Sequence, residues 1–179
     1  AVRHPDVRLE LALDDGLADI VAERFDAGMR MSETIEADMV AVRIGGPNRM
    51  ITVAAPAYLA QRPPPVSVDD LGRHECVRYR YASSGRTMRW IFQRDGRPLE
   101  VEVDGRYIVN DADAEIDLAR RGLGMVQTLD SLVADDLRDG ALVSWGEAKA
   151  PPIEIWALYP SRRLLSSRVS ALLDLLGQH

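Results

Sequence analysis

Residues 50–65, MITVAAPAYLAQRPPP, decide how the fold is built, because an apolar, β-branched run ends there at Pro56. The run is typical of a buried strand. Pro56 suits the first turn of a short helix predicted over AYLAQR, and the prolines at 63–65 cannot continue that helix. A core strand that stops less than a third of the way along the chain indicates that the backbone leaves one lobe here and enters a second.

The segments before this stretch predict a β-α-β unit. Residues 7–13 alternate apolar and other side chains, residues 17–25 repeat apolar side chains at helical spacing, and residues 26–31 suggest a second short strand. A unit of this size requires a parallel sheet. Two further strands are expected at 38–46 and 49–55, on either side of a turn with the composition Gly-Gly-Pro-Asn.

The segments after it repeat the alternation of strands and helices. A hairpin is predicted to turn at Asp95-Gly96, and a helix to begin at Asn110-Asp111 and to end at Gly122. A closing amphipathic helix over 163–177 needs an apolar partner, and the first lobe is short of helices, so the chain is expected to return to it near Tyr159-Pro160. We therefore predict an α/β fold of two Rossmann-like lobes joined by a two-stranded hinge, with lobe I formed by 1–54 and 161–179 and lobe II by 55–160. In such a fold, ligands bind in the cleft between the lobes, at strand carboxyl ends and helix N-termini.

The composition limits the classes of function. The chain has 22 basic and 28 acidic side chains and a net charge of -6, which disfavours nucleic acid as a partner because that requires a basic face. A single cysteine excludes an intrachain disulfide, and three scattered histidines show no ligating spacing, so no metal and no cofactor is expected. No apolar run approaches the roughly 20 residues of a membrane span, and no signal-peptide layout opens the chain, so we expect a cytoplasmic protein.

Several segments, taken in order, resemble one family. HPDVRLELAL, LADIVAERFDAGMRMSE, MITVAAPAYLAQRP and DLGRHECVRY look like the effector-binding domain of LysR-type transcriptional regulators. So do the later segments VDGRYIVNDADAEIDLARRGLGMVQTLDSLVADDLRDGALV and IWALYPSRRLLSSRVSALLDLL. The resemblance covers essentially the whole chain, although the family's first sensor strand and most of the helix after it would precede Ala1.

This resemblance implies a ligand sensor of periplasmic-binding-protein-like (type 2) fold in a cytoplasmic bacterial transcription factor. Small metabolites, often organic anions, would bind between the lobes and change how dimers and tetramers sit on DNA. The resemblance further implies a homodimer, a tetramer in the full-length regulator, and no membrane partner. DNA would be contacted only through a winged helix-turn-helix domain that this chain lacks.

Polar residues at predicted strand ends are the candidate ligand contacts. Arg30 and Ser32 follow the strand at 26–31, although an ordinary surface loop with Arg30 paired to Glu33 or Glu36 explains them equally well.

A second group of candidates follows the strand predicted at 76–81. The loop there offers hydroxyl groups, backbone N–H groups and a planar guanidinium, which suit a carboxylate or phosphate. A flexible polar loop is the plain alternative. Asn110 at a helix N-terminus, for which an ordinary cap is sufficient explanation, and Thr128 at a further strand end complete the set. The loop candidates are Ser83, Ser84, Arg86 and Thr87.

Two other functions stay open. A stand-alone solute-binding protein of a transport system would share the two lobes. A small enzyme would work through Cys76, with His74 two residues away as its base, or through an acidic pair such as Asp135-Asp136. A buried structural cysteine and aspartates at caps and turns explain these residues more simply, so we expect no enzyme and no catalytic residue.

Overall fold

The structure, a computed structural model, divides the chain into two compact units, Ala1–Pro47 with Glu154–His179 and Asn48–Ile153. The expected lobe boundaries, between residues 54 and 55 and between residues 160 and 161, remain predictions. The structure describes residues 8–12, 20, 22, 24–31, 39–145, 152–160 and 167–176, without the side chain of Arg168. Within those residues, no helix is long and apolar enough to cross a bilayer.

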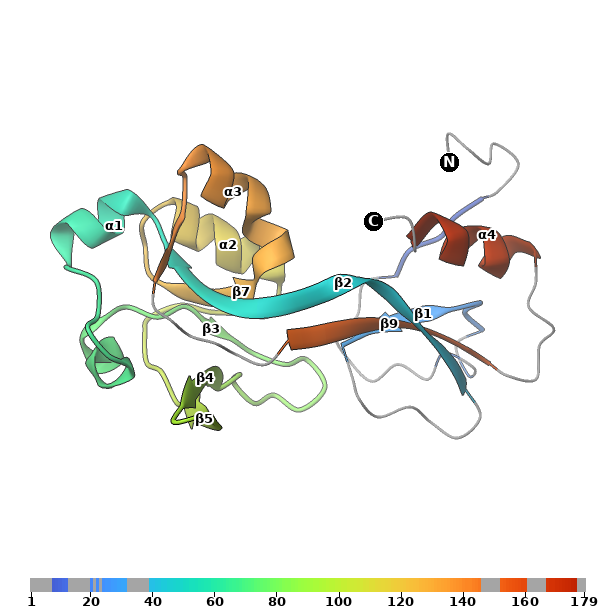
Figure 1. The fold of residues 1–179 in the computed structure, drawn as a ribbon, viewed down its shortest axis with the longest axis horizontal. Helices are drawn as coiled ribbons and strands as arrows, with labels where there is room; N and C mark the ends of the chain where they lie inside the picture. Colours follow the sequence, from blue (N-terminus) through green and yellow to red (C-terminus); the bar gives the residue numbers. More distant parts are fainter. Residues whose placement is uncertain are drawn as a thin grey trace. The chain divides into compact units, whose positions relative to one another are not determined.

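The first unit contains paired strands of one sheet and the closing helix (Figure 1). β1 (Gly28–Arg30) pairs antiparallel with β9 (Pro152–Pro160), and β9 in turn neighbours β2 (Met39–Ala54). α4 (Ser167–Leu176) lies within the helix predicted at the end of the chain, and its Val169 is buried.

Two expectations for the first unit are wrong. Residues 8–12 form no strand, and the side chains of Leu9 and Leu11 are 57% and 70% exposed. Alternation produces a strand only where another element covers the apolar face. β1 therefore has no parallel partner within the described residues 8–12 and runs antiparallel to β9 instead. The helix predicted at 17–25 lies largely outside the described residues.

The predicted turn at 45–48 is also wrong, because β2 continues through it from Met39 to Ala54. Gly45 has a φ of 66°, a left-handed conformation that glycine adopts without strain. Gly45 is therefore an irregular residue within the strand and does not reverse the chain. β2 consequently contributes residues to both units.

The second unit alternates short strands and helices. β7 and β8 pair antiparallel with β2, β3 pairs parallel with β6, and β4 and β5 form the predicted hairpin, turned at Asp95 and Gly96 with φ of 52° and 75°. The elements, in chain order, are α1 (Pro56–Gln61), η1 (Val68–Arg73), β3 (Arg78–Tyr79), β4 (Trp90–Arg94), β5 (Arg97–Val101), β6 (Ile108–Val109), α2 (Ala112–Arg120), β7 (Val126–Leu129), η2 (Asp130–Val133), α3 (Ala134–Asp139) and β8 (Val143–Trp145).

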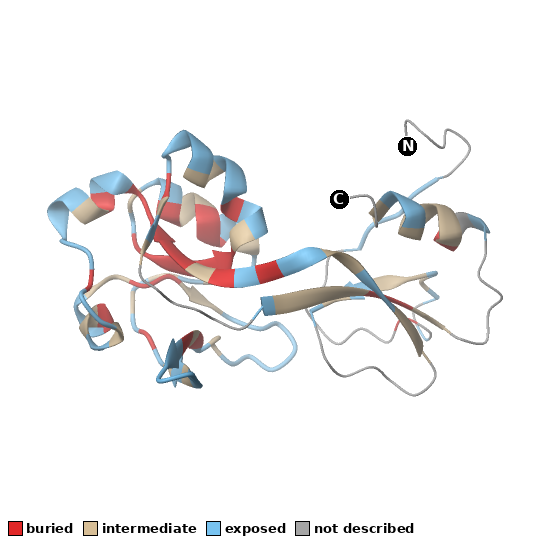
Figure 2. Ribbon diagram, in the orientation of Figure 1, coloured by how far each residue is buried: buried red, intermediate tan, exposed pale blue. Residues whose placement is uncertain are grey.

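Neighbouring residues on three central segments alternate between two apolar clusters, because successive side chains of an extended backbone point to opposite faces. The cluster on the side of α2 and α3 includes Val53, Val77, Val126 and Ile116. The cluster on the side of the hairpin includes the chain neighbours of the first three, Ala54, Cys76 and Met125, together with Trp90. Figure 2 shows the buried residues gathered on β7, on the end of β2 and on the inner face of α2.

Candidate functional site

The carboxyl ends of the parallel strands β3 and β6 lie side by side in the second unit. Their register places Tyr79 opposite Val109, and the Arg80 N–H donates to the Val109 carbonyl at 2.6 Å. From this edge β3 continues into the loop 81–87, and β6 continues into the start of α2. Ligands of α/β proteins bind where the connections after parallel strands diverge in this way.

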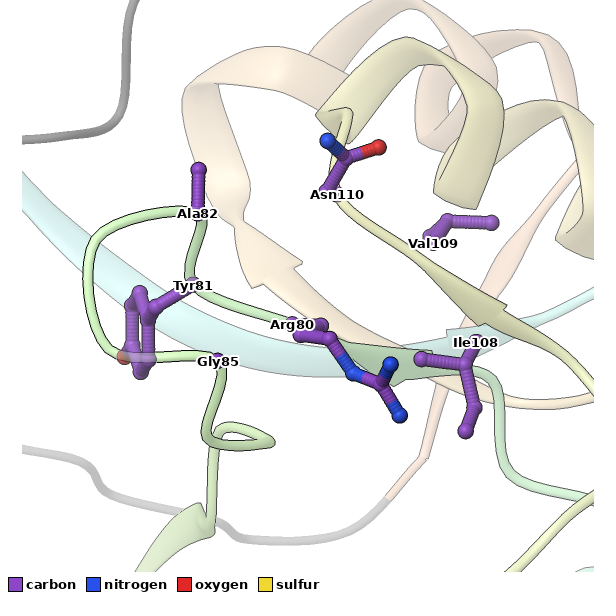
Figure 3. A pocket seen from close by; sticks show the side chains of 7 residues that line it. All are labelled: Arg80, Tyr81, Ala82, Gly85, Ile108, Val109 and Asn110. Carbon is purple, nitrogen blue, oxygen red and sulfur yellow. The ribbon is translucent and has the colours of Figure 1, made fainter.

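A pocket of about 330 Å³ opens at this edge. Figure 3 shows the Arg80 guanidinium extended toward Ile108 and the Tyr81 ring beside Gly85. The pocket therefore combines a cation with apolar and aromatic walls and an amide. Its lining residues are Arg80, Tyr81, Ala82, Gly85, Ile108, Val109 and Asn110.

Arg80 carries the positive charge of the pocket. Its guanidinium has no hydrogen bond or ion pair with any residue that the structure describes. Arg78, two residues earlier, is by contrast held by Asp104 at 3.5 Å and by the Gly105 carbonyl at 3.1 Å. A guanidinium presents a planar fork of donors that matches a carboxylate or phosphate. Arg80 is thus free to pair with an anion that enters the pocket.

The loop after β3 closes on itself. The Gly85 N–H donates to the Tyr81 carbonyl at 2.9 Å, and the Tyr81 N–H donates to the Arg86 carbonyl at 2.9 Å. The Arg86 N–H donates to Oγ of Ser84 at 3.3 Å. These three N–H groups are already used, so the expectation that this loop offers its backbone N–H groups to an anion does not hold for them. The side chains of the loop remain as possible contacts.

The start of α2 is fixed by two side chains. Oδ1 of Asp111 accepts from the Ala114 N–H at 2.8 Å, which confirms the predicted cap. The Tyr79 hydroxyl donates to the Asn110 carbonyl at 3.1 Å, and the Tyr79 ring meets the Tyr81 ring edge-on with centroids 5.8 Å apart. Tyr79 therefore contacts two walls of the pocket, Asn110 and Tyr81.

The predicted site residues fall in different places. Asn110 lines the pocket. Thr128 is 4% exposed in β7, opposite Ile51 of β2, and Arg30 is half-buried at the end of β1 in the other unit. Ser32 lies outside the described residues. The four loop candidates, which belong to the pocket's loop but not to its lining residues, are Ser83, Ser84, Arg86 and Thr87.

Two pocket residues, Arg80 and Tyr81, are missing from the predicted site. Both end the strand predicted at 76–81, so the signal for them was their place at a strand terminus. The predicted loop began two residues too late to include both of them. Contact of any predicted residue with a ligand stays a prediction.

The residues considered for catalysis have structural partners. Cys76 is 1% exposed, and burial raises the pKa of its thiol to about 12, so the thiol stays protonated at neutral pH. Nδ1 of His74 shares a hydrogen bond with the Tyr58 hydroxyl at 3.2 Å. Asp136 accepts two hydrogen bonds from Arg120, at 2.7 and 2.8 Å, which lower the pKa of its carboxyl group. In the part of the chain that the structure describes, no group of three His, Cys, Asp or Glu residues could hold a metal ion.

A pocket at the diverging carboxyl ends of parallel strands defines a ligand-binding α/β domain. The chain belongs to the family described as LysR substrate binding domain, whose sequence model matches residues 1–179. The fold is accordingly the type 2 periplasmic-binding-protein-like fold.

The relatives of the chain are transcriptional regulators. It is 41% identical over 176 residues to a putative transcriptional regulator of Pseudomonas aeruginosa, covering 98% of this chain and 58% of that protein. It is 34% identical over 172 residues to the HTH-type transcriptional regulator PgrR of Escherichia coli, covering 96% and 58%. The chain therefore spans a little more than half the length of these relatives. The regulatory domain of CrgA, a LysR-type regulator from Neisseria meningitidis, matches the fold with a TM-score of 0.85 at 23% identity, over 99% of this chain and 86% of that one.

These matches confirm the resemblance inferred from the sequence: the chain is the effector-binding domain of a LysR-type transcriptional regulator. The alternative of a solute-binding protein of transport gains no support from them. The family is one of regulators and not of enzymes.

Proposed function

We propose that this domain senses a small organic anion, whose carboxylate or phosphate group is bound by Arg80 at the ends of β3 and β6. The observation that carries the proposal is a guanidinium without a partner among the described residues, in a pocket that also contains Tyr81 and Ile108. Hydrogen bonds between charged groups are roughly twice as strong as neutral ones. Arg80 would supply most of the affinity, and the apolar walls would select the shape of the ligand.

The other predicted contacts extend this proposal. Asn110 would add an amide at the pocket, and the loop would add the hydroxyl and guanidinium groups of Ser83, Ser84, Arg86 and Thr87. Arg30, Ser32 and Thr128 stay predicted contacts. An effector changes a regulator only through its different affinity for two conformations, so some of these contacts must form in one conformation and not in the other.

Thermal unfolding of this chain against a panel of small anions tests the proposal. Monocarboxylates, dicarboxylates and phosphate esters are each compared with the uncharged amide or alcohol of the same shape. An anion present at 100 times its Kd adds about 2.7 kcal/mol to the free energy of unfolding and raises Tm by several degrees. The uncharged analogue should leave Tm unchanged.

A pair of variants locates the anion. In Arg80→Gln, the Kd of a stabilising anion should rise about 10- to 100-fold, because a charged hydrogen bond is worth roughly 1.5–3 kcal/mol. Arg97→Gln makes the same charge change on an exposed residue of β5 and should change the Kd by less than about twofold. Equal affinities of both variants in calorimetry would show that the anion binds elsewhere.

For the whole regulator, we infer a cytoplasmic homodimer, tetrameric at full length, that contacts DNA through a winged helix-turn-helix domain. The HTH-type relatives, of which this chain covers a little more than half, support that inference. We infer no cofactor and no catalytic activity. Sedimentation of this chain over a wide concentration range tests the dimer, and a single monomeric species throughout would contradict dimerisation through the sensor domain.

A further inference from the structure

Helix α2 carries an acidic side chain on its apolar face. Glu115 is 2% exposed, whereas Asp113 on the same helix is exposed and Asp117 is half-buried. Ile116 and Ala119, one and four residues further on, pack into the cluster on the helix side. Residues four apart share a helix face. Glu115 therefore occupies a position at which this packing would be expected to place an apolar side chain.

The carboxyl group of Glu115 is not compensated by a neighbour. Its Oε1 atom is buried and has no hydrogen-bond partner in the described part of the chain. Buried polar atoms are nearly always hydrogen-bonded, and the exceptions require a specific explanation.

The strands packed against α2 contain no cation that is free to pair with Glu115, and Arg80, which directly follows β3, extends its guanidinium toward Ile108 in the pocket (Figure 3). These strands are β3, β6 and β7, and the last two contain no charged or titratable residue. On β3, Arg78 is held by Asp104, and Tyr79 donates its hydroxyl hydrogen to the Asn110 carbonyl.

α3 contributes the acidic residues Asp135, Asp136 and Asp139 and one cation, Arg138. Asp136 is paired with Arg120 of α2, and Arg138 is paired with Asp135 at 2.8 Å and with Asp139 at 3.4 Å. On α2 itself, Arg121 is paired with Asp117. Each of these charges therefore has its own partner, or adds a negative charge, so nothing on these elements would neutralise a carboxylate at Glu115.

The first turn of α2 is continuous with the pocket wall. Asn110 lines the pocket and directly precedes the capping residue Asp111. The Glu115 N–H donates to the Asp111 carbonyl at 3.1 Å, and the Ala114 N–H to the Asp111 side chain at 2.8 Å. Glu115 is therefore linked to Asp111 and, through it, to Asn110 within one turn of helix.

We propose that the protonation state of Glu115 regulates the pocket by moving the first turn of α2. The neutral carboxyl group of Glu115 stays buried on the inner face of α2. A carboxylate is costly to bury without a partner, so on ionisation it moves toward water and displaces Asp111 and Asn110. As a control of effector binding, this inference rests on the proposed function. As a movement of α2, it stands without it.

Burial raises the pKa of Glu115 to about 8, which sets the pH range of the experiment. Nuclear magnetic resonance on the whole labelled chain, without added ligand, follows the Glu115 carboxyl carbon and the amides of Asn110, Asp111 and Ala114 between pH 5.5 and 9.5. We expect the carbon to titrate with a midpoint near 8, and the three amides to follow the same midpoint.

Two variants separate the movement from general effects of pH. Glu115→Gln keeps the size of the side chain and should abolish the pH dependence of the three amides. Glu75→Gln removes a carboxylate that is already paired with Arg106 at 3.2 Å, and should leave that dependence intact.

A carboxyl midpoint below about 6 would overturn the proposal. A midpoint near 8 with three unresponsive amides would overturn it as well, as would amide shifts that persist in Glu115→Gln. The titration of the wild-type chain decides the first two outcomes even if a variant does not fold. Because no effector is used, failure of this inference and failure of Arg80 to bind an anion are distinguishable.

Discussion

Gly105 lies against the backbone of Cys76. A Cβ atom at position 105 would lie 2.1 Å from the Cys76 carbonyl oxygen and 2.8 Å from the Cys76 nitrogen. These are backbone atoms of a buried segment, which cannot rotate away as a side chain can. Gly105→Ala should therefore lower the free energy of unfolding by roughly 3 kcal/mol or more, measured from the urea midpoint.

Gly72 provides the matched control, because a Cβ there would meet no atom within 4 Å. Gly72→Ala should change the free energy of unfolding by less than about 0.5 kcal/mol. Similar losses in both variants would contradict the close approach of residues 76 and 105.

Gln127 fastens the hairpin to the sheet from a fully buried position on β7. Its Oε1 accepts from the Ile91 N–H at 2.7 Å, and its Nε2 donates to the Ile91 carbonyl at 3.0 Å. Gln127→Leu fills similar space but leaves both backbone groups of Ile91 unpaired. Because each unpaired buried group costs roughly 1–3 kcal/mol, unfolding should become easier by about 2–4 kcal/mol in urea titrations.

Gln93 is a matched glutamine on the exposed side of the same hairpin. Its Nε2 donates to the Gly96 carbonyl at 3.4 Å, so Gln93→Leu should cost less than about 0.5 kcal/mol. If Gln127→Leu cost no more than this, the bidentate bond to Ile91 would have no role in stability.

At the scale of elements, the cap of α2 is the local interaction most open to test. Asp111→Ala removes the acceptor for the Ala114 N–H and should cost about 1 kcal/mol in thermal or urea unfolding. Asp111→Asn keeps a side-chain oxygen at the same position and should lose less than half as much. Equal losses would mean that the negative charge of Asp111, and not its hydrogen bond, stabilises the helix.

Elements set by local chemistry were predicted well from the sequence. Pro56 begins α1, Asp95 and Gly96 turn the hairpin with positive φ, Asp111 caps α2, and Gly140 ends α3 with a φ of 75°. At Pro56, Asp95-Gly96 and Asp111, each predicted from the sequence, and at Gly140, which shows the same local chemistry, the conformation of one or two residues decides the outcome. Short-range signals of this kind are present in the sequence itself.

Elements that depend on distant partners were predicted poorly. β1 pairs with β9, which lies more than 100 residues later, and its own residues contain no signal for that direction. Gly45 looks the same in a turn and within β2, and only the continuity of pairing tells them apart. The site shows the same division. Asn110, which was predicted from its place at a helix start, lines the pocket. Arg80 was not predicted, because only side-chain positions reveal that its guanidinium has no partner among the described residues.

At the scale of the whole molecule, paired carboxylates set the response to acid. Hydrogen bonds from Arg106 lower the pKa of Glu75, and hydrogen bonds from Arg120 lower that of Asp136. A carboxyl group whose pKa is lower in the folded state stabilises the fold above its unfolded value, and this stability is lost as pH falls through the folded value. Protonation of Glu75 and Asp136 at acid pH therefore lowers the free energy of unfolding.

Glu115 has the opposite effect on the free energy of unfolding, and we expect it to dominate the pH dependence of stability above pH 5. Its pKa of about 8 in the folded chain lies above its ordinary value of 4.5, so between those values the folded chain keeps a proton that the unfolded chain releases. The free energy of unfolding contributed by Glu115 therefore falls as pH rises through this window and is constant above it.

Glu115→Gln should remove that slope. Near pH 5 the variant and the wild type should unfold at similar urea concentrations, whereas at pH 8.5 the variant should be more stable by on the order of 3–5 kcal/mol, because one pKa unit corresponds to about 1.4 kcal/mol. Asp117→Asn is the control, since Asp117 is half-exposed and paired with Arg121 at 2.7 Å. It should shift stability by less than about 1 kcal/mol, with little change between the two pH values. The difference in stability between Glu115→Gln and the wild type could instead be the same at pH 5 and at pH 8.5. Glu115 would then not exchange its proton in this range, and its carboxyl group would contribute to packing only.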